Sequence, residues 1–588
     1  MTNIASAAKG RLASGYALSA GLCTALVFAP LVLAQPARAG AQQPVLLDAM
    51  TTELHRAFTS LGKQGSGNQE PDKQLPPYFL SYAVSDASYV GIRAQYGALV
   101  DSAANHVRVA DVQVRLGSPK LDNTHGTHRS SAVNSVQLPL TDDREALSRA
   151  LWLATNTGYG NALDNYLRVK TEAEVRAKEE DSSPDFSQEL PQTYIGKPAP
   201  PVLVDTAVWE RRVTGLSKIF REYPDVYQNM VMLTVQNETD YFASSEGSRV
   251  VAPHLAARLV VFAVTRADDG MDLFRAQTFE AETAAGLPRQ PELEAAMREL
   301  GKSLEELRKA PVTEPFDGPA ILSGRAAAVF FHEVLGHRLE GQRQRGDEEG
   351  QTFTKDIGKD VLPTFLSVAD DPTRTKFGDT WLSGSYLYDD EGEKARKVDL
   401  IDDGVLKTFL MSRLPIANFA NSNGHGRAQS GRMPTGRQGN LIVTSTKMEP
   451  ESELRKQLIE EAKKQGKSYG LYFEDISSGF AVTTRSSPQA FQVIPLVVYR
   501  VYVDGRPDEL VRGVSIVGTP QAALKRILAT GDKSEVFNGE CGAESGTVPV
   551  SAVAPAMLVS EMETQKQAQG TARPPILPIP GAEKQESK

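Results

Sequence analysis

One apolar stretch, residues 330–342 with the sequence FFHEVLGHRLEGQ, constrains this chain more than any other. It places His332, Glu333 and His337 among large apolar side chains. The residues before it begin with Ser323, a residue type that caps helices, and continue with alanine and other helix formers. We therefore predict a buried helix that carries two imidazoles and one carboxylate into the core.

The spacing within this stretch is unusual. A histidine–glutamate pair followed by a second histidine is typical of zinc hydrolases, where imidazoles hold the metal and the carboxylate takes a proton from water. The two ligands normally stand four residues apart, whereas His332 and His337 stand five apart. An ideal helix would separate them by about 140°. We expect a π-bulge near Gly336 to bring them onto one face. Two unrelated histidines would show the same pattern, but a buried Glu333 between them is costly unless it is paired or metal-linked.

The stretch HEVLGHRLEG resembles the signature of the TldD/PmbA family of metallopeptidases. The resemblance continues, in order, through residues 384–392 (GSYLYDDEG), 402–410 (DDGVLKTFL), 423–440 (NGHGRAQSGRMPTGRQGN), 473–479 (FEDISSG) and 540–551 (ECGAESGTVPVS). Upstream, residues 244–250 (SSEGSRV) are similar to a turn of the family's first domain. In the active, TldD-like branch, the resemblance implies one Zn²⁺ per chain, held by His332, His337 and Cys541. It also implies unfolded or extended peptides as substrates, and a homodimer or a heterodimer with a TldD/PmbA-type homologue.

The cysteine count supports a role for Cys541. The chain has two cysteines, and the other, Cys23, lies in the predicted leader. The mature chain would then have no partner for an internal disulfide. A buried free cysteine that acts as a small apolar residue is the alternative. Because Cys541 stands in a glycine-rich, acidic segment that we predict to be a loop, ligation as a thiolate is a further explanation.

Residues 1–39 have the pattern of a secretory signal peptide. Basic residues precede an apolar run over residues 16–34, and Ala37-Arg38-Ala39 fits a cleavage site. We expect an exported protein, periplasmic or secreted, with an uncleaved span as the alternative. Loss of Lys9, Arg11 and Arg38 with the leader lowers the formal net charge from −9 to −12. We therefore expect no nucleic-acid partner, and no other apolar run is long enough to span a membrane.

The rest of the chain predicts an α+β protein of two domains. Interleaved strands and helices over residues 40–312 indicate an N-terminal α/β domain, interrupted by polar segments at residues 63–77 and 179–202. Residues 313–564 indicate a β-rich C-terminal metallopeptidase domain that carries the metal-site helix. Asp403-Gly404 predicts a tight hairpin turn within it. Residues 565–588 predict a proline-rich, disordered tail.

Several other polar residues are candidates for the site. His125 and His128 lie in a polar segment without a nearby carboxylate, so we expect surface histidines. His425 with Arg427, Arg432 and Arg437 forms either a binding segment for a peptide carboxylate or carbonyl, or a flexible basic turn. Glu340 stands three residues after His337, where it either supports that imidazole or faces solvent.

The sequence thus predicts a zinc-dependent peptidase in which Glu333 is the catalytic general base. A non-catalytic, peptide-binding or scaffold partner of an active homologue is the alternative, although it would be expected to lack the histidine motif or the cysteine. A metal-storage protein would need several clusters of histidine and cysteine, which eight histidines and two cysteines do not provide.

Overall fold

The structure is a computed structural model that describes residues 44–62, 75–126, 133–175, 181–346 and 349–567, together with Pro575, Leu577 and Pro580. The predicted signal peptide, most of the linker at residues 63–77, His128 and most of the predicted tail lie outside these residues. Residues from Gln43 onward form one compact unit. Among the helices of the described ranges, none has both the length and the apolar character needed to cross a bilayer.

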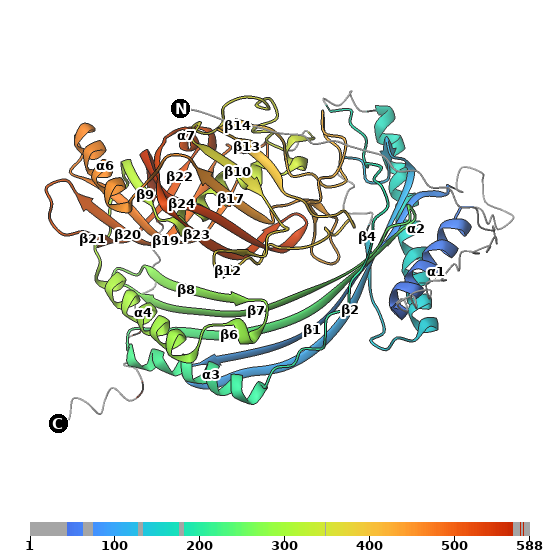
Figure 1. Cartoon of the computed structure of the whole chain (residues 1–588), viewed down its shortest axis with the longest axis horizontal. Coiled ribbons are helices and arrows are strands. Elements are labelled where there is room, and N and C mark those ends of the chain that lie inside the picture. Colours follow the sequence, from blue (N-terminus) through green and yellow to red (C-terminus); the bar gives the residue numbers. More distant parts are fainter. Residues whose placement is uncertain are drawn as a thin grey trace, which may run out of the picture. The chain divides into compact units, whose positions relative to one another are not determined.

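The first half of the unit contains a sheet of long antiparallel strands. Within the described residues its order is β3-β2-β1-β6-β7-β5, with β4 on β2 and β8 on β7. Only β5 pairs in parallel. Figure 1 shows β1, β2, β6 and β7 side by side. The strands are β1 (Pro77–Gln95), β2 (Ala98–Ser118), β3 (Leu121–Asp122), β4 (Val133–Gln137), β5 (Thr193–Ile195), β6 (Gln228–Ser244), β7 (Arg249–Arg266) and β8 (Asp272–Ala281).

Helices cover one face of this sheet because apolar side chains alternate along its strands. In β1, Leu80, Tyr82 and Val84 pack against α1 (Val45–Ser60) and α2 (Arg144–Val175). Further along the same face, Val90 and Ile92 pack against α3 (Thr206–Lys218) and α4 (Gln290–Lys309). A 3₁₀ turn (Ile219–Glu222) continues α3, and another (Ala284–Gly286) precedes α4. The opposite face of the sheet is left for contacts with the second half of the chain.

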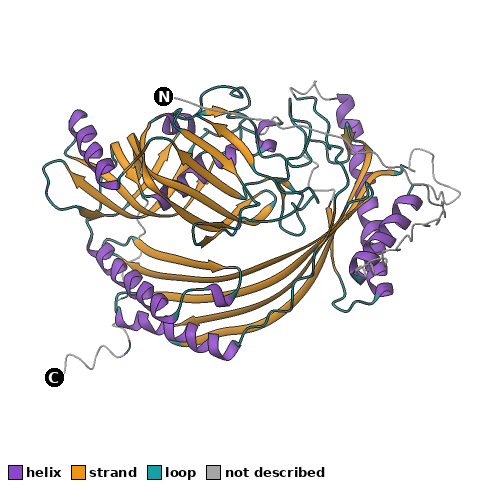
Figure 2. Ribbon diagram, in the orientation of Figure 1, coloured by secondary structure: helices purple, strands orange, loops and turns teal. Residues whose placement is uncertain are grey.

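The second half is built on a mixed sheet whose order is β14-β13-β10-β17-β24-β22-β20-β19-β9 over the described residues. Because β24 also pairs with β9, the strands β9, β19, β20, β22 and β24 close into a ring. Figure 2 shows many loops around these strands. The strands are β9 (Asp317–Leu322), β10 (Leu366–Asp370), β13 (Val398–Asp402), β14 (Val405–Leu406), β17 (Asn440–Ser445), β18 (Met448–Glu449), β19 (Tyr469–Ala481), β20 (Phe491–Tyr502), β21 (Glu509–Val511), β22 (Val514–Gly518), β23 (Ile527–Ala543) and β24 (Gly546–Lys566).

The remaining elements are short. The helices of this half are α5 (Gly324–Val334), α6 (Glu451–Lys464) and α7 (Pro520–Lys525), with 3₁₀ turns at Gly336–Leu339 and Gly341–Gln344. Two small strand pairs join β11 (Lys376–Phe377) to β12 (Thr380–Trp381) and β15 (Gly426–Arg427) to β16 (Thr435–Gly436). Helix α5 follows β9 directly and lies within the main core of this half. The core therefore fixes the position of the histidine motif.

The predicted α+β class is confirmed, and several elements differ in detail. Within the interleaved strands and helices expected over residues 40–312, β1 is one long strand that is continuous over Pro77–Gln95. The Asp403-Gly404 turn is present between β13 and β14, with positive φ angles of 46° and 83°. Strand β24 reaches Lys566, two residues into the predicted tail. The domain boundary expected near residue 312 stays a prediction.

Candidate metal centre

Helix α5 carries the first candidate ligand and begins as the sequence predicts. The Ser323 hydroxyl accepts a hydrogen bond from the Ala326 amide at 3.1 Å and donates to the Glu474 carbonyl at 2.7 Å. Every residue of the helix except Arg325 is buried, and His332 is 4% exposed. The cap fixes the start of the helix, and the apolar core around it fixes the direction in which His332 points.

The predicted π-bulge is wrong, because the helix ends before the second histidine. Helix α5 stops at Val334, and a 3₁₀ turn from Gly336 to Leu339 carries His337. The Leu335 amide still donates to the Phe331 carbonyl at 3.1 Å, whereas the Arg338 amide donates to the Leu335 carbonyl at 2.9 Å. Tighter winding after the helix end, rather than wider winding within it, brings the two imidazole rings to a centroid distance of 4.9 Å.

Gly336 is required at this turn for a steric reason. A Cβ atom there would lie 2.0 Å from Oε1 and 2.3 Å from Cδ of Gln438, a side chain that is 1% exposed. These distances are far below a van der Waals contact. The backbone of the ligand turn therefore approaches the side chain of Gln438 so closely that only glycine fits.

Cys541 completes a cluster with the two histidines. It lies in β23, paired with Val548 of β24, and is 6% exposed, so the prediction of a loop is wrong. Its Sγ lies 3.3 Å from His332 Nε2 and 3.3 Å from His337 Nε2. The three donor atoms all lie within 4.8 Å of one another. The hairpin of β23 and β24 is what brings this sulfur to residues more than two hundred positions earlier.

The donor set fits a zinc ion. With ordinary zinc bond lengths and tetrahedral angles, a nitrogen and a sulfur ligand lie roughly 3.6 Å apart, and two nitrogens roughly 3.3 Å apart. The nitrogen–sulfur distances here are 3.3 Å. In the described part of the chain, these three residues are the group of histidine, cysteine and acidic side chains that can hold one ion. Three protein donors leave a fourth position for water or substrate.

The charges around the cluster favour a cation between the donors. Burial alone raises the pKa of the Cys541 thiol, but the imidazoles of His337 and His332 hold this pKa well below its ordinary value. Burial also raises the pKa of Glu340, yet His337, Arg343 and Arg437 outweigh it and lower that pKa to about 2. A thiolate and a carboxylate thus surround the imidazole of His337.

Glu340 orients His337, which agrees with the prediction that it supports that imidazole and not with the alternative that it faces solvent. Its Oε1 lies 3.0 Å from His337 Nδ1 and its side chain is 0% exposed. An ionised carboxylate only accepts hydrogen bonds, so Nδ1 carries a proton and Nε2 is the ring nitrogen that faces the cluster. Among the described residues, His332 Nδ1 has no hydrogen-bond partner.

Glu333 faces a cavity beside the cluster. Its Oε2 lies 3.9 Å from His337 Nε2. The cavity has a volume of about 540 Å³ and is lined by both halves of the chain, including Arg258, Thr278, Glu333, Ser477 and Phe480 together with the three donors. Gly479 leaves room for the carboxylate, since a Cβ atom there would lie 2.8 Å from Glu333 Cγ. The carboxylate can therefore reach a molecule in the cavity.

The other candidates lie away from the cavity. His125 is bonded through Nδ1 to Asp185 at 2.8 Å. His425 is 0% exposed, and its Nε2 lies 3.3 Å from Asp370 Oδ1. Arg427 donates to the carbonyls of Gln438 and Pro549. These buried contacts show a structural role for His425 and Arg427, so neither a flexible turn nor a substrate-binding surface describes them.

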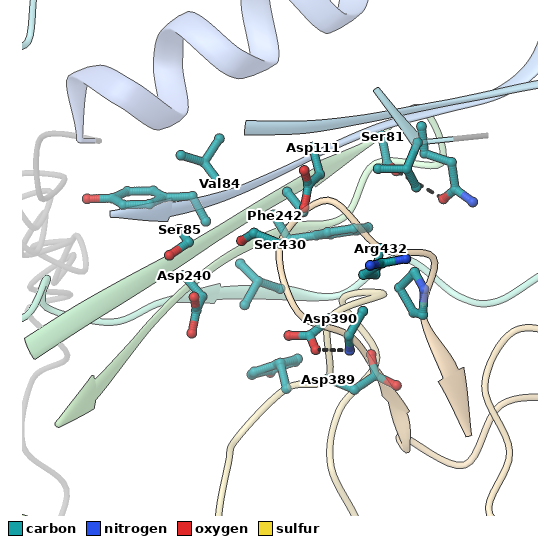
Figure 3. Close-up of a pocket in the computed structure, with 18 of the residues that line it drawn as sticks. Ser81, Val84, Ser85, Asp111, Asp240, Phe242, Asp389, Asp390, Ser430 and Arg432 are labelled. Atoms are coloured by element: carbon teal, nitrogen blue, oxygen red, sulfur yellow. Dashed lines mark hydrogen bonds between the residues drawn. The ribbon is translucent and has the colours of Figure 1, made fainter. Parts of the chain in front are cut away.

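Arg432 lines a second cavity, between the first sheet and the loops of the second half (Figure 3). The cavity also contains Asp111, Asp240, Asp389 and Asp390, and none of the three donors lines it. Burial raises the pKa of Asp389 well above its ordinary value, although its carboxylate accepts hydrogen bonds from backbone amides of Glu391, Glu393 and Gly426. Asp390 and Asp111 likewise accept hydrogen bonds from the amides of Ala428 and Gly431, so three of these acidic residues hold the loops by bonds to the backbone.

Sequence reasoning missed the role of Gln438 and misread Arg437. Arg437 is 0% exposed, and its Nη2 donates to the Cys541 carbonyl at 2.7 Å, so it does not meet substrate. Gln438 donates from Nε2 to the His332 carbonyl at 3.4 Å. The available sequence signal is a pair of glycines, Gly436 and Gly439, which flank these side chains within residues 423–440. Glycines at such positions are typical of a close backbone approach, but they do not show which residue is approached.

Comparison with known proteins places the second half in a family. Residues 316–566 match the family model of the PmbA/TldA metallopeptidase C-terminal domain. The chain is 28% identical over 261 residues to a metalloprotease of Archaeoglobus fulgidus, and the aligned region covers 44% of this chain and 56% of that protein. It is 28% identical over 252 residues to the metalloprotease TldD homolog of Haemophilus influenzae, covering 42% of this chain and 47% of that protein. The chain thus spans about half the length of these curated relatives.

A third relative and a solved structure extend the similarity. A zinc metalloprotease TldD homolog of Saccharolobus solfataricus is 24% identical over 367 residues, covering 60% of this chain and 76% of that protein. The crystal structure of TldE from Thermococcus kodakarensis shares the fold, with a TM-score of 0.57 and 13% identity over 88% of this chain and 100% of that chain.

Proposed function

Because this chain belongs to the TldD/PmbA family, we propose that it is a zinc-dependent peptidase of the TldD-like branch, with one ion held by His332, His337 and Cys541. The observation that carries the proposal is the position of Glu333. Its carboxylate lies beside the three donors and faces the same cavity. A site for metal storage would have no use for a free carboxylate aimed at an open volume.

Each residue of the site has a separate role in the proposed peptide hydrolysis. When bound, zinc supplies Lewis-acid chemistry, which polarises a carbonyl group and makes water more acidic. Glu333 takes a proton from the attacking water at a carboxylate oxygen and passes it to the leaving amine. Glu340 keeps the proton of His337 on Nδ1 and so keeps Nε2 directed at the ion. The wall of the cavity holds the peptide and limits access of water.

The cavity wall suits an extended peptide. Strand β19 pairs with β9 only over Leu471–Phe473, so within the described residues its edge is free along Ser477–Ala481, which line the cavity. A free strand edge binds extended chains through backbone hydrogen bonds that do not depend on sequence. We therefore propose unfolded or extended peptides as the substrate class.

Two further proposals concern the setting of this activity. The apolar run and cleavage pattern of residues 1–39 support an exported, periplasmic or secreted protein. The family supports a dimer, formed by two copies or with a TldD/PmbA-type homologue. Size-exclusion chromatography with light scattering on the mature chain tests the first arrangement, and fractionation of cells tests the location. A monomer with full activity would contradict the dimer, and retention in the cytoplasm would contradict export.

The decisive experiment uses Glu333→Gln. This variant keeps the size of the side chain but cannot accept a proton at neutral pH. We expect it to keep about one zinc per chain and to lose peptide cleavage by about 100-fold or more, measured by mass spectrometry on a mixed peptide library. Glu460→Gln is the matched control, because Glu460 is an exposed residue of α6.

Two results would contradict the proposal. Cleavage by Glu333→Gln at the parental rate would show that Glu333 is not the base. A zinc-loaded parent that cleaves no peptide, alone or with a homologous partner, would show a non-catalytic peptide-binding or scaffold protein instead.

A further inference from the structure

Two consecutive buried residues, Arg437 and Gln438, lie against the metal cluster. They connect β16 to β17 and are 0% and 1% exposed. The flanking glycines have no room for a side chain: a Cβ atom on Gly436 would lie 2.2 Å from the Leu410 carbonyl oxygen, and one on Gly439 would lie 3.0 Å from the Gly384 carbonyl oxygen. The backbone of this segment, residues 436–439, is therefore closely packed against its neighbours beside the three donors.

Arg437 holds the strand that carries Cys541. Its Nη2 donates to the Cys541 carbonyl at 2.7 Å. Its Nη1 donates to the Ser545 hydroxyl at 2.8 Å and to the Gly546 carbonyl at 3.0 Å. The guanidinium thus binds the end of β23, the turn that follows and the start of β24. Because these bonds fix the backbone of the hairpin tip, they also fix where the Cys541 sulfur lies.

The same guanidinium reaches the second ligand through Glu340. Arg437 Nε lies 3.5 Å from Glu340 Oε1, and both side chains are 0% exposed. That carboxylate oxygen is the one that accepts the hydrogen bond from His337 Nδ1. Arg343 pairs with the other oxygen, Oε2, at 3.2 Å. Opposite charges that share a buried site of low polarity interact strongly, so Arg437 holds the carboxylate in the place where it orients His337.

Gln438 contacts the first ligand and the turn between the two histidines. Its Nε2 donates to the His332 carbonyl at 3.4 Å, and its amide fills the space next to Gly336. The Gln438 carbonyl in turn accepts a bond of 2.7 Å from Arg427 Nη1. One dipeptide therefore contacts Cys541 and His332 directly and reaches His337 through Glu340, although it is distant from all three donors in the sequence.

We propose that Arg437, with Gln438, is a positioning residue that preorganises the metal cluster by fixing both the Cys541 hairpin and the Glu340–His337 pair. A substrate-binding role does not fit, because Arg437 is fully buried and both of its Nη atoms are bonded to the protein. The proposal rests on the proposed zinc site, but not on peptide cleavage. Partners that orient ligands contribute to metal affinity, and their loss typically lowers it 10- to 100-fold.

The test measures metal binding, and not only activity. Zinc affinity is determined by competition with a chromophoric chelator for the parent, Arg437→Met and Arg437→Lys. The same proteins loaded with cobalt report the thiolate bond and the geometry through their visible spectra. Arg413→Met is the matched control, since Arg413 is a buried arginine, 1% exposed, that bonds Glu246 and the Ser187 carbonyl and none of the donors.

We expect Arg437→Met to bind zinc 10- to 100-fold more weakly and to show a weakened or shifted thiolate–cobalt band. Arg437→Lys should lie between it and the parent, because lysine restores the charge near Glu340 but cannot bond both strands of the hairpin. Arg413→Met should stay within about threefold of the parent, since it touches no donor.

Two outcomes would overturn the inference. In the first, Arg437→Met and Arg437→Lys both bind zinc within threefold of the parent and give its cobalt spectrum. In the second, Arg413→Met loses as much affinity as Arg437→Met. If the parent binds zinc but cleaves no peptide, the proposed function fails while the affinities still decide the inference. If the parent binds no zinc, both fail.

Discussion

Gly336→Ala tests the steric account of the ligand turn. The added Cβ atom would lie 2.0 Å, 2.3 Å and 2.6 Å from Oε1, Cδ and Nε2 of Gln438. Because Gln438 is buried, its amide cannot move into solvent, and the turn must shift instead. Overpacking by one methyl group costs about 1–3 kcal/mol, and loss of the bond from Gln438 to His332 costs about 1 kcal/mol more. We expect a destabilisation of about 2–4 kcal/mol.

A double-mutant cycle separates this clash from a general loss of glycine. Gln438→Ala removes the atoms that the new methyl group meets, so Gly336→Ala should cost less in that background than in the parent. We expect a coupling free energy of about 1–3 kcal/mol. Gly160→Ala in α2 is the control, since no atom lies within 4 Å of its added Cβ, and it should be neutral or stabilising by up to about 1 kcal/mol.

The assay is urea unfolding in the presence of a chelator, which measures the fold without the metal, followed by zinc titration of the same proteins. The destabilisation of the double variant is compared with the sum of the destabilisations of the two single variants. Agreement to within about 0.5 kcal/mol would refute the contact. So would a Gly336→Ala protein with the stability and zinc affinity of the parent.

One prediction concerns the metal centre, and a second concerns two buried acids, Glu391 and Glu393. Cys541→Ala removes an anionic donor, so a chelator should lower the Tm of the zinc-loaded parent and leave that of the variant unchanged; equal shifts would place the metal elsewhere. Burial raises the pKa of Glu391 and Glu393 from 4.5 to about 7. Their protonated forms stabilise the fold below pH 4.5, and this stabilisation, about 1–3 kcal/mol per group, is lost as the pH rises to 7. The free energy of unfolding of the parent minus that of Glu393→Gln should therefore fall between pH 5 and pH 8, and a constant difference would contradict the shift.

Local chemistry made the helix and one turn of this protein predictable. Ser323 caps α5, and the apolar run after it is buried, as helix start signals and periodicity indicate. The Asp403-Gly404 turn follows from the positive φ angles that these residue types accept. Both signals act within a few residues, so no knowledge of the rest of the chain is needed to read them.

Contacts between distant segments were not predictable. The turn at Gly336 depends on Gln438, and the burial of Cys541 depends on the register of β23 with β24. Residues 179–202 read as a polar loop, yet Phe186 is 3% exposed and lies between the guanidinium groups of Arg115 and Arg413, at 3.8 Å and 4.0 Å from its ring. Each of these features is made by partners that composition and periodicity do not reveal.

The long separation between Cys541 and the histidines also orders events in time. The sulfur donor is encoded 204 residues after His337 and 209 residues after His332. At about 5–20 residues per second, a ribosome needs roughly 10 to 40 s to cover that interval. During it, the nascent chain has both imidazoles and Glu333 but lacks the thiolate and its hairpin. The cluster of three donors is therefore complete only after most of the scaffold that encloses it has already been made.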